Sequence, residues 1–177
     1  CARRKLREKT GFEAPYLEQL GSFGNATRDP RGWSATHVYF ALVPSLDTEL
    51  QAGGNAADVR WADVEDERVS GRLAFDHAEL LRAALQRLRA KVEYTSLPVY
   101  LLPAEFTLSE LQQTYELVLG RELEKKAFRT RLLAADILEP LPRTKGGANR
   151  PAQLYRLKRR RGLHIFSRPF GSADPPG

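Results

Sequence analysis

A short run near the start of the chain, RKLREKTGF, combines one carboxylate with several cations at helical spacing. Glu8 lies between Lys5 and Lys9, and Arg4 lies one helical turn before it. A hard ion such as Mg²⁺ requires carboxylate oxygens, and a lysine ammonium cannot bind it. Two lysines beside one carboxylate can instead neutralise a bound anion directly. The alternative is an ordinary amphipathic helix in which Glu8 is an ion-paired residue.

A second group of cations lies in the other half of the chain, around the run KKAFRTR. Residues 1–102 carry 14 basic and 14 acidic residues, whereas residues 103–177 carry 14 basic and 8 acidic ones. The whole net charge of +6 therefore belongs to the second half. This distribution indicates two domains, the second of which faces a polyanion. A basic surface that only confers solubility is the alternative.

The elements around KKAFRTR predict a winged helix–turn–helix domain. Thr107 and Glu110 form a T-x-x-E capping box that starts a helix, and Gly120 ends it. A second helix is predicted over residues 123–138, with Phe128, Leu132 and Ala135 on its apolar side. The strand-like segments LEPLPR and QLYRLKRR follow, separated by a glycine-rich basic tip. Such a helix can enter the major groove of DNA.

The candidate DNA contacts follow from projecting the second helix at about 100° per residue. Lys126, Thr130 and Arg131 face outward, and the small side chain of Ala127 allows close approach to the groove. Further contacts, mainly with phosphates, are expected from both helices and the wing: Thr107, Lys125, Arg129, Arg143, Lys145 and Arg150. The alternative is a solvated cationic helix face. RNA is a weaker candidate, because no aromatic platform for stacking single-stranded bases is visible.

The first half reads as mixed α and β structure. Strands are predicted over residues 16–24 and 35–43, and residues 45–59 are predicted to form a polar loop. Asp76, followed by Glu79, predicts the start of a helix with an apolar stripe. Pro103 is a plausible boundary, so we expect two domains, 1–102 and 103–177.

Composition narrows the possible classes of site. Cys1 is the single cysteine, so neither an internal disulfide nor a cysteine metal cluster is expected, which suits a reducing cytoplasm. His37 and His164 alternate with apolar residues and have no companion ligands, so we predict no metal site. No apolar run approaches the roughly 18 residues of a membrane span. The chain lacks methionine and begins within a predicted helix, so we interpret it as part of a longer protein.

Matched residue by residue, RKLREKTGF resembles the end of the Nudix box, R-E-U-x-E-E-x-G-U, in which U is a bulky aliphatic residue. The positions that fit, with Phe12 as a conservative departure, are Arg4, Leu6, Glu8, Gly11 and Phe12. Lys5 and Lys9 replace two of the glutamates that hold Mg²⁺ in that family. The resemblance thus implies a degenerate box with no catalytic residues, suited to sensing a nucleotide diphosphate.

Further runs, among them YLEQLGSFG, RDPRGW, LAFDH and RPAQLYRLKRR, resemble the Nudix-related transcriptional regulators of NAD metabolism, the NrtR family. The resemblance implies an α+β fold: a partial Nudix-like α/β/α sandwich, N-terminally truncated, followed by a winged helix–turn–helix domain. It implies a cytoplasmic homodimer that represses NAD biosynthesis or salvage genes by binding palindromic double-stranded operator DNA. The implied effector is ADP-ribose or a related nucleotide diphosphate, with no required cofactor and no membrane association.

The resemblance places the ADP-ribose pocket at RDPRGW and LAFDH. Two arginines suit bidentate contacts with a diphosphate, Asp29 can accept from a ribose hydroxyl, and an aromatic residue can stack on adenine. The full candidate set is Phe23, Arg28, Asp29, Arg31, Trp33, Asp76 and His77. The alternatives are a solvated β-turn for RDPRGW, a helix N-cap for Asp76 and a bystander role for His77.

Three readings of the whole chain therefore stand beside one another. The leading one is an ADP-ribose-responsive repressor. The second is an active Nudix ADP-ribose pyrophosphatase with an appended nucleic-acid-binding domain. The third is a nucleic-acid-binding protein without a ligand, which would show salt-dependent DNA affinity and no sequence preference.

Overall fold

The computed structural model describes residues 1–44, 60–146, 151–158 and 163–170. The chain divides into two compact units, residues 1–87 and 88–177. This boundary precedes the one expected at Pro103, because the connector between them belongs to the second unit. Within that connector, Leu97 is fully buried and Val99 is 5% exposed. The predicted loop 45–59 lies outside the described residues.

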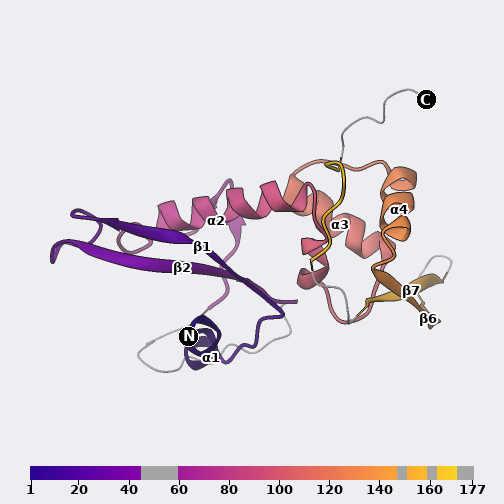
Figure 1. The fold of residues 1–177 in the computed structure, drawn as a ribbon, viewed down its shortest axis with the longest axis horizontal. Coiled ribbons are helices and arrows are strands. Elements are labelled where there is room, and N and C mark those ends of the chain that lie inside the picture. Colours follow the sequence, from indigo (N-terminus) through magenta and orange to yellow (C-terminus); the bar gives the residue numbers. More distant parts are fainter. Residues whose placement is uncertain (45–59, 147–150, 159–162, 171–177) are drawn as a thin grey trace. The chain divides into compact units, whose positions relative to one another are not determined.

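The first unit contains a helix, a long hairpin, a short hairpin and most of a second helix (Figure 1). These elements are α1 (Ala2–Thr10), β1 (Tyr16–Asn25), β2 (Ser34–Leu42), β3 (Val64–Glu65), β4 (Arg68–Val69) and α2 (His77–Val92). α1 ends at Gly11, which adopts a left-handed φ of 77° that glycine accommodates without strain. β1 and β2 pair antiparallel with one register shift, between Gln19 and Gly21. Both long strands lie where the sequence predicts them.

Alternation along β2 shows which face of the hairpin is covered. Val38 and Phe40 are half-buried, whereas the neighbouring His37 and Tyr39 are exposed. His37 is placed by Ser22, whose Oγ lies 2.8 Å from its Nδ1 across the strand pair. The face with Val38 therefore turns toward the interior of the unit.

The second unit is a winged helix (Figure 1). Its elements are η1 (Leu97–Leu101), β5 (Phe106–Thr107), α3 (Leu108–Leu119), α4 (Lys125–Ala134), β6 (Leu138–Lys145) and β7 (Ala152–Leu157). The three strands form one antiparallel sheet in the order β5–β7–β6, so β5 joins the sheet just before α3 begins. The hairpin of β6 and β7 is the wing.

The core of the second unit lies between α3 and α4. Leu111, Tyr115 and Leu132 are fully buried, and Phe128 is 2% exposed. The hydroxyl of Tyr115 donates to the carbonyl oxygen of Thr95 at 2.7 Å, which satisfies its polar atom inside the core. Burial raises the pKa of Tyr115 well above its usual value. The predicted apolar side of the second helix is therefore confirmed at Phe128 and Leu132.

The predicted extent of the second helix, 123–138, is wrong at its C-terminal end. α4 stops at Ala134, and Asp136 has a left-handed φ of 52° before β6 starts at Leu138. A left-handed residue cannot continue an α-helix, so the chain turns there into the wing. Ala135, expected on the apolar side of the helix, is its C-terminal cap and is half-buried.

Candidate functional site

Helix α1 carries five cations and a single acid: Arg3, Arg4, Lys5, Arg7, Lys9 and Glu8. Both oxygens of Glu8 are occupied, because Oε1 accepts from Arg4 Nη1 at 2.5 Å and Oε2 lies 3.1 Å from Nζ of Lys5. The hydrogen bond from Lys5, followed by the one from Arg4, lowers the pKa of Glu8. Glu8 is thus an ion-paired helix residue, as the sequence suggests, but Arg4 takes the place expected of Lys9.

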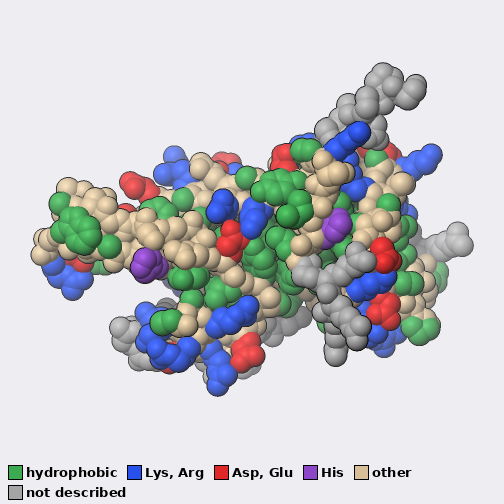
Figure 2. All heavy atoms as spheres, in the orientation of Figure 1, with side chains coloured by type: hydrophobic (Ala, Val, Ile, Leu, Met, Phe, Trp, Pro, Cys, Tyr) green, Lys and Arg blue, Asp and Glu red, His purple; other side chains and the backbone are tan. Residues whose placement is uncertain are grey.

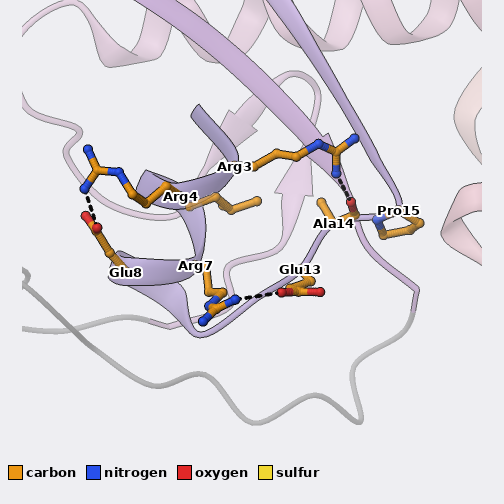
Figure 3. A pocket seen from close by; sticks show the side chains of 8 residues that line it. Arg3, Arg4, Arg7, Glu8, Glu13, Ala14 and Pro15 are labelled. Carbon is orange, nitrogen blue, oxygen red and sulfur yellow. Dashed lines mark hydrogen bonds and ion pairs between the residues drawn. The ribbon is translucent and has the colours of Figure 1, made fainter. Parts of the chain in front are cut away.

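A hollow of about 690 Å³ lies against α1 and the segment that follows it (Figure 3). Arg3 donates to the carbonyl oxygen of Ala14 at 2.8 Å, and Arg7 donates to Oε1 of Glu13 at 3.0 Å. Each glutamate in the lining is therefore paired with an arginine. In the part of the chain that the structure describes, no three His, Cys, Asp or Glu side chains gather as a metal site. This lining does not suit Mg²⁺, which requires free oxygen ligands.

The tip of the β1–β2 hairpin is tied to the start of α2 by an ion pair. Arg28 Nε donates to Oδ2 of Asp76 at 2.9 Å, and Nη2 donates to Oδ1 at 3.1 Å. The side chains are only 12% and 15% exposed, so this bidentate pair is largely shielded from water. The hydrogen bond from Arg28 lowers the pKa of Asp76. Two predicted effector residues, 48 positions apart in the sequence, therefore hold each other.

A second arginine of the tip is also held by a carboxylate. Arg31 Nη2 donates to Oδ2 of Asp29 at 2.6 Å, and its Nε donates to Oδ1 at 3.0 Å. The backbone N–H of Arg31 adds a bond to Oδ1 of Asp29 at 2.9 Å. The Arg31 side chain is 83% exposed, so a diphosphate can reach it by exchanging partners with Asp29.

Replacing Arg31 with glutamine is expected to return the pKa of Asp29 from about 2 toward its ordinary value of 3.8, since the side-chain hydrogen bond from Arg31 is the largest cause of its lowering. The depressed pKa means that the pair contributes stability above pH 3.8 and loses it as the pH falls through about 2. A carbon-13 NMR titration of the carboxyl groups measures both values. Asp76, which pairs with Arg28, is the internal control. An unmoved Asp29 midpoint would show that Arg31 is not the cause.

The aromatic candidates are placed differently from one another. Trp33 is 72% exposed at the hairpin tip, whereas Phe23 lies half-buried within β1. His77 is exposed in the first turn of α2, and its ring lies 6.0 Å from that of Phe75. Phe75 belongs to the predicted LAFDH run but not to the candidate set of residues, and it is 60% exposed with a left-handed φ of 49° next to Asp76. An apolar residue in that conformation is strained, and such strain concentrates at functional positions.

The predicted first helix of the DNA-binding unit begins as the sequence indicates. The Thr107 hydroxyl accepts from the N–H of Glu110 at 3.2 Å, and Oε2 of Glu110 accepts from the N–H of Thr107 at 2.8 Å. This capping box is complete, and Gly120 ends α3 with a left-handed φ of 68°. Thr107 is 5% exposed and fully used by the cap. The structure therefore places this predicted DNA contact inside the unit.

Glu124 fixes the start of α4 and was missed by sequence reasoning. Its carboxylate accepts from the N–H of Lys126 at 2.9 Å and from the N–H of Ala127 at 2.6 Å. These bonds, with the larger contribution from Ala127, lower the pKa of Glu124. Glu116 and Gln112 fix the preceding turn, because Glu116 accepts from the N–H of Leu123 and Gln112 donates to the Leu123 carbonyl, both at 2.9 Å.

The outer face of α4 brings three of the predicted contacts together with the small side chain of Ala127. Lys125, Lys126, Ala127 and Thr130 are all exposed. They border two shallow depressions of about 440 and 420 Å³, which share Lys126 and Thr130 in their lining. In shape and charge this face suits the edge and backbone of a nucleic-acid groove. We call these four residues the reading face.

The two arginines of α4 also line these depressions, but their guanidinium groups contact other parts of the unit. Arg129 Nη2 donates to Oγ of Ser109 at 3.2 Å, and its Nε is buried with no hydrogen-bond partner among the described residues. Arg131 donates to two carbonyl oxygens of the C-terminal segment, Pro169 at 2.7 Å and Arg168 at 3.3 Å. Both guanidinium groups are therefore engaged in contacts within the unit, which the sequence did not suggest.

Each described cation of the wing strands is paired with an acid. Arg143 pairs with Glu105, and Lys145 Nζ lies 2.5 Å from Oε1 of Glu110. The other two pairs are Arg156 with Glu139 and Lys158 with Asp136. Figure 2 shows acidic and basic side chains beside one another over this hairpin. Arg150 at the wing tip lies outside the described residues.

Two family models match the chain, one to each unit. Residues 1–84 match the NUDIX domain, and residues 98–157 match the NrtR DNA-binding winged helix domain. A Nudix domain joined to a DNA-binding winged helix defines a class of Nudix-related regulators. Shewanella oneidensis NrtR, in a crystal structure with a 27mer DNA, is 35% identical, with a TM-score of 0.78. The match covers 95% of this chain and 76% of that one, so the chain belongs to the NrtR family.

Two curated relatives add functional context. The "ADPR responsive transcriptional repressor NtrR" of Acinetobacter baylyi is 49% identical over 157 residues, which are 89% of this chain and 62% of that protein. An "ADP-ribose pyrophosphatase" of Methanocaldococcus jannaschii is 29% identical over 79 residues, 45% of this chain and 44% of that protein. The chain thus spans less than two thirds of either relative. Within the described residues, no helix is both long and apolar enough to cross a membrane.

Proposed function

We propose that this chain is the sensing and DNA-binding part of a transcriptional repressor controlled by ADP-ribose. The observation that carries the proposal is the reading face, which displays Lys125, Lys126 and Thr130 on a helix of an NrtR-type winged helix. The Acinetobacter relative, named as an ADP-ribose-responsive repressor, supports the same role. The regulated genes would be those of NAD biosynthesis or salvage.

The effector would bind the Nudix unit. Two regions are suited to a diphosphate: the arginine-lined hollow beside α1 and the exposed Arg31 at the hairpin tip. Because the carboxylates nearby are already paired with arginines or lysines, recognition would use guanidinium and ammonium groups in place of Mg²⁺. ADP-ribose affinity would then be the same in EDTA as in Mg²⁺.

The repressor would act as a cytoplasmic homodimer on a palindromic operator. Two reading faces spaced about one turn of DNA, roughly 34 Å, would contact successive major grooves. An effector that alters their spacing would weaken simultaneous binding. By reciprocity, operator DNA would change the affinity for ADP-ribose by the same factor as ADP-ribose changes the affinity for DNA.

Fluorescence anisotropy of the full-length protein tests this proposal. The DNA is a labelled duplex from upstream of its own gene or of NAD-pathway genes, titrated in the presence and absence of ADP-ribose. We expect sequence-specific binding that ADP-ribose changes. Equal binding to unrelated duplexes, with no response to ADP-ribose, would instead identify a general nucleic-acid-binding protein.

An active ADP-ribose pyrophosphatase is the second candidate, favoured by the Nudix match and by the similarity to the Methanocaldococcus enzyme. The lysines at positions 5 and 9 argue against it, because hydrolysis by this box needs acids there. Chromatography of ADP-ribose incubated with the protein and Mg²⁺ decides the matter. Sustained turnover would favour the enzyme, and its absence would favour the sensor.

A further inference from the structure

The segment 163–170 crosses the winged helix and is bound to it along its length. The backbone N–H of Ser96 donates to the carbonyl of His164 at 3.0 Å, and Oγ of Ser96 accepts from the N–H of His164 at 3.0 Å. Farther on, the N–H of Phe166 donates to the backbone carbonyl of Tyr94 at 2.8 Å, and the N–H of Phe170 donates to the backbone carbonyl of Glu93 at 2.6 Å. We call this segment the strap. It lies beyond the matched winged helix domain, which ends at residue 157.

Phe170 at the end of the strap is a core residue of the helix–turn–helix. It is 3% exposed, and its ring centroid lies 4.7 Å from that of Tyr115 on α3 and 5.5 Å from that of Phe128 on α4. Phe166 of the strap completes the cluster, because its ring centroid lies 4.8 Å from that of Phe170. Because this ring fills the space between both helices, its position sets how α4 packs against α3.

Two arginines of the helix–turn–helix hold this end of the strap in place. Arg121, between α3 and α4, donates to the carbonyl of Phe170 at 2.7 Å. Arg131 of α4 donates to the carbonyls of Pro169 and Arg168, and its guanidinium carbon lies 4.9 Å from the centroid of the Phe170 ring. Arg131 thus uses the forked donors of its guanidinium and also makes a cation–π contact with Phe170. A lysine at this position would lack the fork.

We propose that Arg131 is a positioning residue: it does not read a base, but fixes the reading face through the strap and Phe170. The inference rests on the DNA-binding role proposed above. If the Arg131 guanidinium turned toward DNA, it would lose its hydrogen bonds to two carbonyl oxygens and its contact with the Phe170 ring. Base contacts are then left to Lys126 and Thr130 of the reading face, and the strap is part of the DNA-binding unit.

The test uses four single variants of the full-length protein, one double variant, and a duplex selected by the natural protein from a random library. Arg131→Lys keeps the charge and loses the forked donors, and Phe170→Leu keeps an apolar side chain and removes the ring. Their controls are Arg156→Lys, an arginine of the wing paired with Glu139, and Ile165→Ala, a strap side chain that is 67% exposed. Affinity is measured by anisotropy at several salt concentrations, at a temperature where each variant is fully folded.

We expect Arg131→Lys and Phe170→Leu each to weaken binding of the selected duplex by about tenfold, and the double variant to be no weaker than the worse single one. Such non-additivity is the signature of two residues that act through one contact. The salt slope stays that of the natural protein, because no phosphate contact is lost. Amide hydrogen exchange in α4 becomes faster in both variants and stays unchanged in both controls.

Three results would overturn the proposal. Arg131→Lys could alter preference at one base pair while Phe170→Leu binds normally, which would identify Arg131 as a base contact. The losses of affinity in the two single variants could multiply in the double variant, which would show that Arg131 and Phe170 act independently. Both variants could melt at lower temperature yet bind with natural affinity, which would reduce the strap to stability alone. If the natural protein selects no sequence, the proposed function fails, and hydrogen exchange in α4 still decides the role of the strap.

Discussion

Replacing Phe128 with alanine is expected to lower the free energy of unfolding of the DNA-binding unit by about 3–5 kcal/mol. The Phe128 ring is 2% exposed and contacts the rings of Tyr115 and Phe170, with centroids 5.2 and 5.5 Å away. Its removal leaves a cavity that two helices and the strap cannot close without moving. Since a domain of this kind is stable by about 5–15 kcal/mol in total, the loss threatens folding itself.

Urea unfolding followed by circular dichroism measures this loss. The matched control is Leu117→Ala on α3. Leu117 is 82% exposed, so this substitution takes little apolar area out of the core. Its expected change is within about 0.5 kcal/mol. Equal effects of the two substitutions would mean that Phe128 does not pack between the helices as described.

Removing both lysines at the start of α4, by Lys125→Ala and Lys126→Ala together, is expected to weaken DNA binding roughly 50-fold at 0.1 M salt. Each lysine that neutralises a phosphate contributes about 0.9 to the slope of log affinity against log salt concentration. Removing Lys125, which is expected to contact a phosphate, should therefore lower the magnitude of that slope by about 0.9. Removing Lys126 deletes a base contact, which costs about 1–3 kcal/mol of affinity and leaves the slope unchanged.

Anisotropy at four or five salt concentrations gives both the affinity and the slope. Arg156→Ala is the control within the same unit, because two bonds of 2.9 Å already hold that guanidinium on Glu139. It should leave the slope unchanged. A double lysine variant with the natural slope would locate the phosphate contacts elsewhere and would remove the main support for the reading face.

Local signals explain which parts of the fold were predictable. The box formed by Thr107 and Glu110 and the glycine at position 120 delimit α3, and each acts within a few residues of its own position. The long strands were found because apolar residues alternate along them. β5, by contrast, has only two residues, too few to show a period, and it exists because Phe106 and Thr107 pair with β7.

The candidate sites were less predictable, because their key contacts join distant positions. A helical projection correctly displays Lys126 and Thr130, whose side chains point straight out from α4. It also places Arg131 outward, yet a long side chain can bend toward a partner, here 38 positions farther along the chain. The pairing of Arg28 with Asp76 likewise depends on the folded hairpin. The charge distribution and Pro103 already indicated two domains. The NrtR resemblance added the ADP-ribose effector and the palindromic operator.

The strap bears on how this module can be transplanted. A designer who joined the winged helix to another sensor, and cut at residue 157 where the match to the winged helix family model ends, would discard Phe166 and Phe170. The excised piece would keep the reading face but lose the Phe170 ring, which packs between α3 and α4. A fusion intended to keep DNA recognition therefore needs the chain through Phe170, because the packed unit extends past the matched family domain.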